Sequence, residues 1–151
     1  VVIDNTNLKD QEYYINTNQT FAFASNTVTA SYGTATAKAI ADTLYTAQDE
    51  TDGLGTEGEV KTQGLKTLHK EKINVQAASI LQSTDWMIVR ATEGGTAVPS
   101  SITTKRAAVR TKANAMCTQI DAASDTAALI ALYVYNDATP PVRPLGELPT
   151  V

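Results

Sequence analysis

The spacing of apolar residues changes near Gly53, and this change restricts the chain to folds that combine strands with helices. Before Gly53 the apolar residues recur two apart, which is the period of a β-strand. The residues in this register are Phe21, Phe23, Val28, Ala30 and Tyr32. Ser25-Asn26 separates the two runs and is typical of a hairpin turn. The pattern therefore predicts antiparallel strands in the N-terminal half.

Two further segments of this half favour extended structure. Glu12 to Ile15 fits a short earlier strand. In Ala37 to Ala47 the alanines favour a helix, whereas the threonines, the tyrosine and the preceding Gly33 favour a third long strand. We expect a strand there.

The second half of the chain follows helical spacing. In a first helix the apolar residues lie four or eight apart, at Leu65, Ile73, Ala77 and Leu81. A second helix, which Ser100, Ser101 or Thr103 can cap, has the clearest amphipathic pattern. Its apolar face is expected at Val109, Ala113, Met116, Ile120 and Ala123. Ser124-Asp125 ends this helix and caps a short third one through Leu132.

The tail from Asn136 contains four prolines and is expected to run as an extended arm, because proline interrupts helices and central strands. Its apolar residues recur three apart, as in a polyproline II helix, and would line one face. They are Val142, Leu145, Leu148 and Val151. Such a face predicts docking onto this chain's own helices or onto a neighbouring subunit, and we favour the neighbour.

Together these segments predict an α+β fold, with a β-rich N-terminal half of antiparallel strands, a helical hairpin and an extended proline-rich tail. The expected regions are residues 1–52 for oligomerisation, residues 53–135 as a helical module and residues 136–151 as the arm. The 151 residues include only two Phe and one Trp, so the core is small. We expect the protein to gain stability from its partners.

Charge, hydropathy and cysteine content exclude several classes of protein. The net charge is −4 and no basic face stands out, which argues against nucleic-acid binding. No window approaches the length of a transmembrane helix, and Val1-Val2-Ile3-Asp4 does not resemble a signal peptide. The single cysteine, Cys117, excludes a disulfide framework within one chain.

Few residues offer chemistry. His69, the only histidine, lies on the apolar stripe of the first helix and is interpreted as a hydrogen-bonded structural residue. Cys117, on the apolar side of the second helix, is interpreted as a small core residue. No nucleophile–base pair, P-loop, dinucleotide fingerprint or HExxH motif occurs. We therefore expect a non-enzymatic protein without a cofactor.

The acidic, glycine-rich loop before the first helix invites a metal interpretation. Aligning Gly53 with the glycine of an EF-hand loop would give three carboxylate ligands, at Glu50, Asp52 and Glu59. However, Gln48 stands where the first aspartate is required. The departure favours a solvated acidic turn over a calcium site.

A less generic stretch covers about residues 77–112. It comprises Leu81-Gln82-Ser83-Thr84-Asp85-Trp86-Met87-Ile88-Val89-Arg90, then Glu93-Gly94-Gly95-Thr96-Ala97-Val98-Pro99, then Arg106-Ala107-Ala108-Val109-Arg110. A helix that ends in a Thr-Asp-Trp turn, a Gly/Pro connection and a second helix that opens with this basic and apolar pattern resemble the phage tail assembly chaperone-like family. Lys105 stands where the family usually has a tyrosine, and this loses an aromatic contact.

The resemblance implies a helical hairpin whose marked residues build structure and present a docking surface. Trp86 is expected to lie across the junction of the two helices and to bury its ring there. Three arginines are expected either to pair with carboxylates of the turn or to be solvated surface residues of little energetic weight. The arginines are Arg90, Arg106 and Arg110, and the carboxylates are Asp85 and Glu93.

The function implied is that of a structural component of a tailed-bacteriophage virion, in the tail, fibre, neck or head decoration, acting by protein–protein docking. The expected partners are other virion proteins and further copies of the chain, and the expected location is the virion, assembled in the bacterial cytoplasm. The alternatives are a non-virion assembly chaperone for a tail or fibre protein and a virion-associated hydrolase, for which no motif supplies a nucleophile–base pair.

Overall fold

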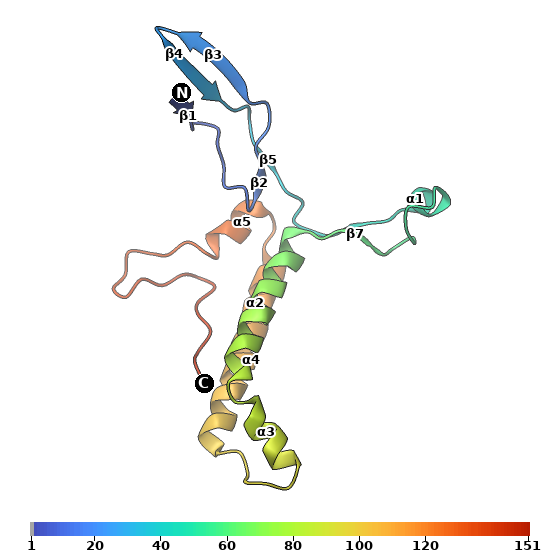
Figure 1. The fold of residues 1–151 in the computed structure, drawn as a ribbon, viewed down its shortest axis with the longest axis vertical. Helices are drawn as coiled ribbons and strands as arrows, with labels where there is room; N and C mark the ends of the chain where they lie inside the picture. The colour runs from blue at the N-terminus through green and yellow to red at the C-terminus, as the bar shows by residue number, and fades with distance from the viewer. Residues whose placement is uncertain (1) are drawn as a thin grey trace. The chain divides into compact units, whose positions relative to one another are not determined.

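The computed structural model describes residues 2–151 and has an α+β fold, with strands in the N-terminal half and helices in the C-terminal half (Figure 1). The chain divides into two compact units, Val1–Leu65 and Lys66–Val151. The division lies after Gly53, because β6 (Thr43–Leu44) pairs with β7 (Val60–Thr62) and closes the glycine-rich loop within the first unit. The proline-rich tail belongs to the second unit.

A three-stranded sheet of order β1-β4-β3 is the main element of the first unit. β3 (Thr20–Ala24) and β4 (Thr27–Ser31) form the expected antiparallel hairpin, and β1 (Val2–Asp4) runs parallel to β4. Ser25 and Asn26 have φ angles of 49° and 58°. Two positive φ angles are what a two-residue hairpin turn requires, so the hairpin prediction is confirmed.

The remaining strands are shorter than expected. β2 (Tyr14–Ile15) occupies the second half of the predicted strand at 12–15 and pairs with β5 (Thr36–Ala37). The long strand predicted over residues 37–47 is wrong. Two acceptors of this segment instead bond the residues at the start of α2 (Leu65–Gln82). The Ala39 carbonyl accepts from the Leu65 N–H, and the Asp42 carboxylate accepts from the Gly64 N–H.

The first unit has little core of its own. Within residues 2–64 the buried hydrophobic side chains are Tyr13 and Ala30. Phe21 and Phe23, the largest apolar side chains of the sheet, are 66% and 72% exposed. Backbone ladders therefore supply much of the order in this unit, and apolar burial supplies little.

α2 and α4 (Ser100–Ala122) form the antiparallel helical hairpin of the second unit (Figure 1). Their contacts run in opposite directions along the two helices: Lys70 pairs with Asp121 at 2.7 Å, and Arg106 donates to the Leu81 carbonyl at 2.7 Å. No helix within residues 2–151 is both long enough and apolar enough to cross a membrane.

The two helices meet largely through the stripes that the sequence predicts, although Leu81 of the predicted α2 stripe is only half-buried. The buried residues of α2 lie four apart, at Leu65, His69, Ile73 and Ala77. Those of α4 alternate between spacings of three and four, at Arg106, Val109, Ala113, Met116 and Ile120. α5 (Thr126–Ala131) adds the fully buried Leu129, and Asp125 caps it by accepting from the Ala128 N–H, as expected.

Two helix boundaries differ from the prediction. Pro99, not Ser100, Ser101 or Thr103, occupies the N-cap of α4, and no side chain caps that end. A further helix, α3 (Asp85–Thr92), follows α2 where the sequence suggested only a turn and a connection.

The tail folds back onto its own unit, which is the first of the two alternatives that the sequence left open, and it does not run as an extended arm. Leu145 is fully buried, its N–H donates to the Leu132 carbonyl at 3.0 Å, and its carbonyl accepts from Lys112 Nζ at 2.9 Å. The Asn136 N–H donates to the Val142 carbonyl, which reverses the chain between them.

This reversal also breaks the expected three-residue repeat of the tail. Val142 is 52% exposed, whereas Leu145 enters the core and Leu148 lines a groove with Val75 and Met116. The four apolar residues therefore do not share one face.

Candidate docking site

The junction between α2 and α3 is built around the guanidinium of Arg106. Its Nη1 donates to the Leu81 carbonyl at 2.7 Å and to Thr84 Oγ1 at 2.6 Å, and its Nη2 donates to Asp85 Oδ1 at 2.7 Å. The Arg106 side chain is 10% exposed and the Asp85 side chain 56% exposed. The predicted pairing of Arg106 with Asp85 is confirmed.

These bonds stabilise two helix ends at once. The last carbonyls of α2 lack partners within the helix, and Leu81 O receives both Arg106 and the Thr84 hydroxyl. Asp85 lies in the first turn of α3, where a carboxylate interacts favourably with the helix dipole. One buried arginine thus fixes the angle between the two helices.

The far end of α3 is also sharply defined. Gly94 has a φ of 83°, its N–H donates to the Ala91 carbonyl, and the Gly95 N–H donates to the Arg90 carbonyl. This pair of bonds is the Schellman arrangement, which needs a residue that tolerates positive φ. A Cβ on Gly95 would lie 2.9 Å from the Arg90 carbonyl oxygen, so glycine is required there as well. α3 is therefore fixed at both ends.

The sequence predicted that Trp86 buries its ring in the junction. This prediction is wrong, because Trp86 is 54% exposed. The buried polar residues of the junction are instead Thr84 and Arg106, which are hydrogen-bonded to each other. Val89, three residues on, is 54% exposed, and the Arg90 guanidinium stacks on the Trp86 ring with its central carbon 4.8 Å from the ring centroid. We name Trp86, Val89 and Arg90 the α3 face.

The other predicted pairs do not form within residues 2–151. Arg90 contacts Trp86 and does not pair with a carboxylate, Glu93 is the C-cap of α3, and Arg110 is exposed without an ion pair. The solvated alternative therefore describes Arg110, whereas Arg106 is structural.

Replacing Trp86 with alanine is expected to lower the free energy of unfolding by only about 1 kcal/mol, because the residue is already 54% exposed to solvent. Urea unfolding followed by far-UV circular dichroism measures this change. A loss of about 3–5 kcal/mol, typical of a fully buried aromatic, would restore the interpretation of Trp86 as a core residue.

The two other candidate chemical residues have structural surroundings. His69 is buried, and its Nδ1 shares a 2.8 Å hydrogen bond with the Tyr133 hydroxyl, which confirms the structural interpretation. Cys117 is only half-buried, at the edge of the α2–α4 contact, with Sγ 3.9 Å from Asn74 Oδ1. Burial raises the pKa of the Cys117 thiol, which disfavours the nucleophilic thiolate.

A cluster of rings and charges fastens the tail to the end of α5. The Arg143 guanidinium lies 5.4 Å from the centroids of both Tyr133 and Tyr135. Arg143 also pairs with Glu147 at 2.8 Å, and Glu147 accepts from the Tyr135 hydroxyl at 2.6 Å. Together with buried Leu145, these contacts make the tail part of the helical unit.

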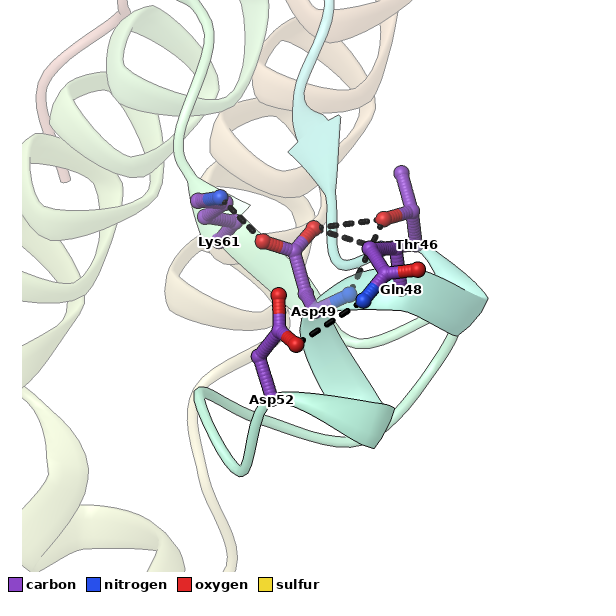
Figure 2. Close-up of polar contacts among 5 residues, drawn as sticks. All are labelled: Thr46, Gln48, Asp49, Asp52 and Lys61. Atoms are coloured by element: carbon purple, nitrogen blue, oxygen red, sulfur yellow. Dashed lines mark hydrogen bonds and ion pairs between the residues drawn. The ribbon is translucent and has the colours of Figure 1, made fainter.

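The acidic loop is organised by Asp49, which the sequence interpretation did not single out. Figure 2 shows the Asp49 carboxylate between Lys61 and Thr46. Lys61 Nζ lies 2.6 Å from Oδ1, and the Thr46 N–H and hydroxyl donate to Oδ2, completing a capping box at the start of α1 (Ala47–Thr51). The Thr46–Asp49 spacing is the sequence signal that could have revealed it.

The suggested calcium ligands are not brought together by this loop. Glu50 accepts from the Glu57 N–H and Asp52 accepts from the Gln48 side chain, while Glu59 lies beyond them on the way to β7. Within residues 2–151 no group of three or more histidine, cysteine or acidic side chains is placed to hold a metal ion.

Calcium is therefore expected to leave the melting temperature of the protein unchanged. Differential scanning calorimetry in chelator and in millimolar calcium makes the comparison, with magnesium as the control for ionic strength. An upward shift specific to calcium would restore Glu50, Asp52 and Glu59 as ligands.

The hydrogen bond from Lys61, reinforced by Thr46, lowers the pKa of Asp49 from 3.8 to about 2. Because the folded pKa is depressed, the stabilisation by Asp49 is present above pH ~4 and is lost as the pH falls through about 2. An NMR titration of the Asp49 carboxyl carbon should show this low midpoint, and Lys61→Met should raise it. A wild-type midpoint near 3.8 would contradict the bonding described.

The chain matches no protein-family model, and comparison with curated proteins and with solved structures finds no match either.

Proposed function

We propose that this protein is a structural component of a tailed-bacteriophage virion that acts by docking its α3 face onto another virion protein. The observation that carries the proposal is the α2–α3 junction fixed by Arg106, next to which Trp86 and Val89 are exposed to solvent. Tryptophan and arginine are the side chains most enriched at the energetic centres of protein interfaces. A half-exposed tryptophan stacked by Arg90 is thus well suited to a partner's pocket.

The residues of the resemblance support the same proposal. Three of them, Arg106, Thr84 and Asp85, are hydrogen-bonded in the α2–α3 junction. Three others, Trp86, Val89 and Arg90, form the α3 face. The motif thus combines a structural part with an exposed part, as expected of a module that binds other proteins.

The weak core of the first unit is a second support. Residues 2–64 bury few large side chains, so this unit gains most from contacts with other subunits. A component held within a particle has such contacts permanently.

Quantitative mass spectrometry of gradient-purified particles tests the proposal. The expected result is that the chain is present at a fixed ratio to the major capsid protein and remains after high-salt washing. A chain that is abundant in infected cells but absent from particles would overturn the structural role and favour the assembly chaperone, which would use the same α3 face transiently.

A further inference from the structure

One face of the β1-β4-β3 sheet is apolar and uncovered. The strand register places Phe21 and Ile3 on the same face, because each is the partner of Ala30 in β4. Phe23 joins them, as the partner of Val28. Ile3, Phe21 and Phe23 are 56%, 66% and 72% exposed. Among residues 2–151, the sheet therefore presents an exposed aromatic surface.

The outer edge of the same sheet is open. β3 is the last strand in the order β1-β4-β3, so within residues 2–151 no strand pairs with its outer edge. Soluble proteins usually protect such edges with charged residues, proline or a bulge. β3 reads Thr-Phe-Ala-Phe-Ala and has none of these, and no charged residue occurs between Tyr13 and Ala37. This edge is therefore unusually permissive for pairing with another strand.

The sequence of β3 is suited to pairing with itself. Phe21-Ala22-Phe23 reads the same in both directions, so an antiparallel pair centred on Ala22 sets Phe21 of each copy opposite Phe23 of the second copy. Cross-strand aromatic pairs of this kind stabilise sheets. The chain carries a net charge of −4, and two copies that meet along this uncharged segment avoid the repulsion of closely apposed carboxylates.

We propose that two copies of this chain associate through β3, paired antiparallel about Ala22, to form a continuous six-stranded sheet with one aromatic face. The occupant of the open edge is thus a second copy and not a different protein. This surface uses other residues than the α3 face, and it stands whether or not the chain is a virion component.

Disulfide trapping tests both the partner and the register. In a Cys117→Ala background, Ala22→Cys would place the two new thiols on directly opposite residues, with Cα atoms about 4.5–5.5 Å apart, within disulfide range. Ala24→Cys is the matched control, since it is an exposed alanine on the same strand and the same side. Its two copies would lie four residues out of register, about 13 Å apart, too far to join.

Under mild oxidation the full-length Ala22→Cys variant is expected to shift from the monomer band to the dimer band, whereas the Ala24→Cys variant stays monomeric. A monomeric Ala22→Cys variant, or equal trapping of both variants, overturns the proposal.

In the parent chain, sedimentation velocity should show a concentration-dependent dimer. Phe21→Lys should dissociate this dimer, and Val75→Lys, a change on the exposed surface of α2, should not. Particle mass spectrometry is independent of these results, so the two proposals can fail separately.

Discussion

Replacing Leu145 with alanine is expected to lower the free energy of unfolding of the helical unit by about 3 kcal/mol. Leu145 is fully buried, and removing most of its side chain leaves a cavity that the tail has little freedom to fill, because Lys112 and Leu132 hold its backbone. Urea unfolding followed by circular dichroism at 222 nm reports on the helices directly.

Val142→Ala is the matched control for this experiment, since Val142 lies in the same tail and is 52% exposed. It should change the stability by less than about 0.5 kcal/mol. Equal effects of the two substitutions would mean that the tail is not part of the helical core.

Arg106→Ala is expected to destabilise the same unit by about 2–3 kcal/mol, through loss of three charge-assisted bonds in the α2–α3 junction. The ion pair alone contributes little, because the Asp85 side chain is 56% exposed. Most of the effect comes from the Leu81 carbonyl and the Thr84 hydroxyl, which lose a buried donor, and from the packed aliphatic stem of the arginine.

Arg110→Ala provides the control for Arg106, because Arg110 is an exposed arginine one turn further along α4. It should be nearly neutral, and Arg106→Lys should fall between the two, since lysine keeps the charge but loses the forked geometry. An Arg106→Ala variant as stable as the Arg110→Ala variant would contradict a stabilising role of Arg106 in the α2–α3 junction.

The regular elements could largely be predicted from the sequence. The period of two around Ser25-Asn26 correctly indicated the hairpin, and the predicted stripes of α2 and α4 are buried except for Leu81. These predictions succeed because one amphipathic face specifies both the element and its buried side. Arg106 as a partner of Asp85 was also predictable, from the resemblance.

The positions of single side chains near chain reversals could not be predicted. Trp86 looked like a core residue because of its size. The junction is instead occupied by Thr84 and Arg106, the groups that donate hydrogen bonds to the Leu81 carbonyl at the end of α2. Similarly, the spacing of Leu145 and Val142 suggested one polyproline face, but the hydrogen bond between Asn136 and Val142 reverses the chain. Such bonds join residues whose pairing no periodicity reveals.

The two proposed surfaces have complementary consequences for assembly. Pairing of β3 would join identical subunits, whereas the α3 face would join a subunit to a different protein. A protein with both kinds of contact can be repeated by symmetry and still be attached at a specific place.

Competitive incorporation is the most direct test of docking by the α3 face. Particles are assembled in cells that produce equal amounts of wild-type chain and Trp86→Ala chain, and mass spectrometry gives the ratio of the two in purified particles. Val75→Ala, a change at a 68% exposed residue of α2, serves as the control. We predict that the Trp86→Ala chain is strongly depleted and that the Val75→Ala chain enters at parity; incorporation of Trp86→Ala at parity would contradict docking through this face.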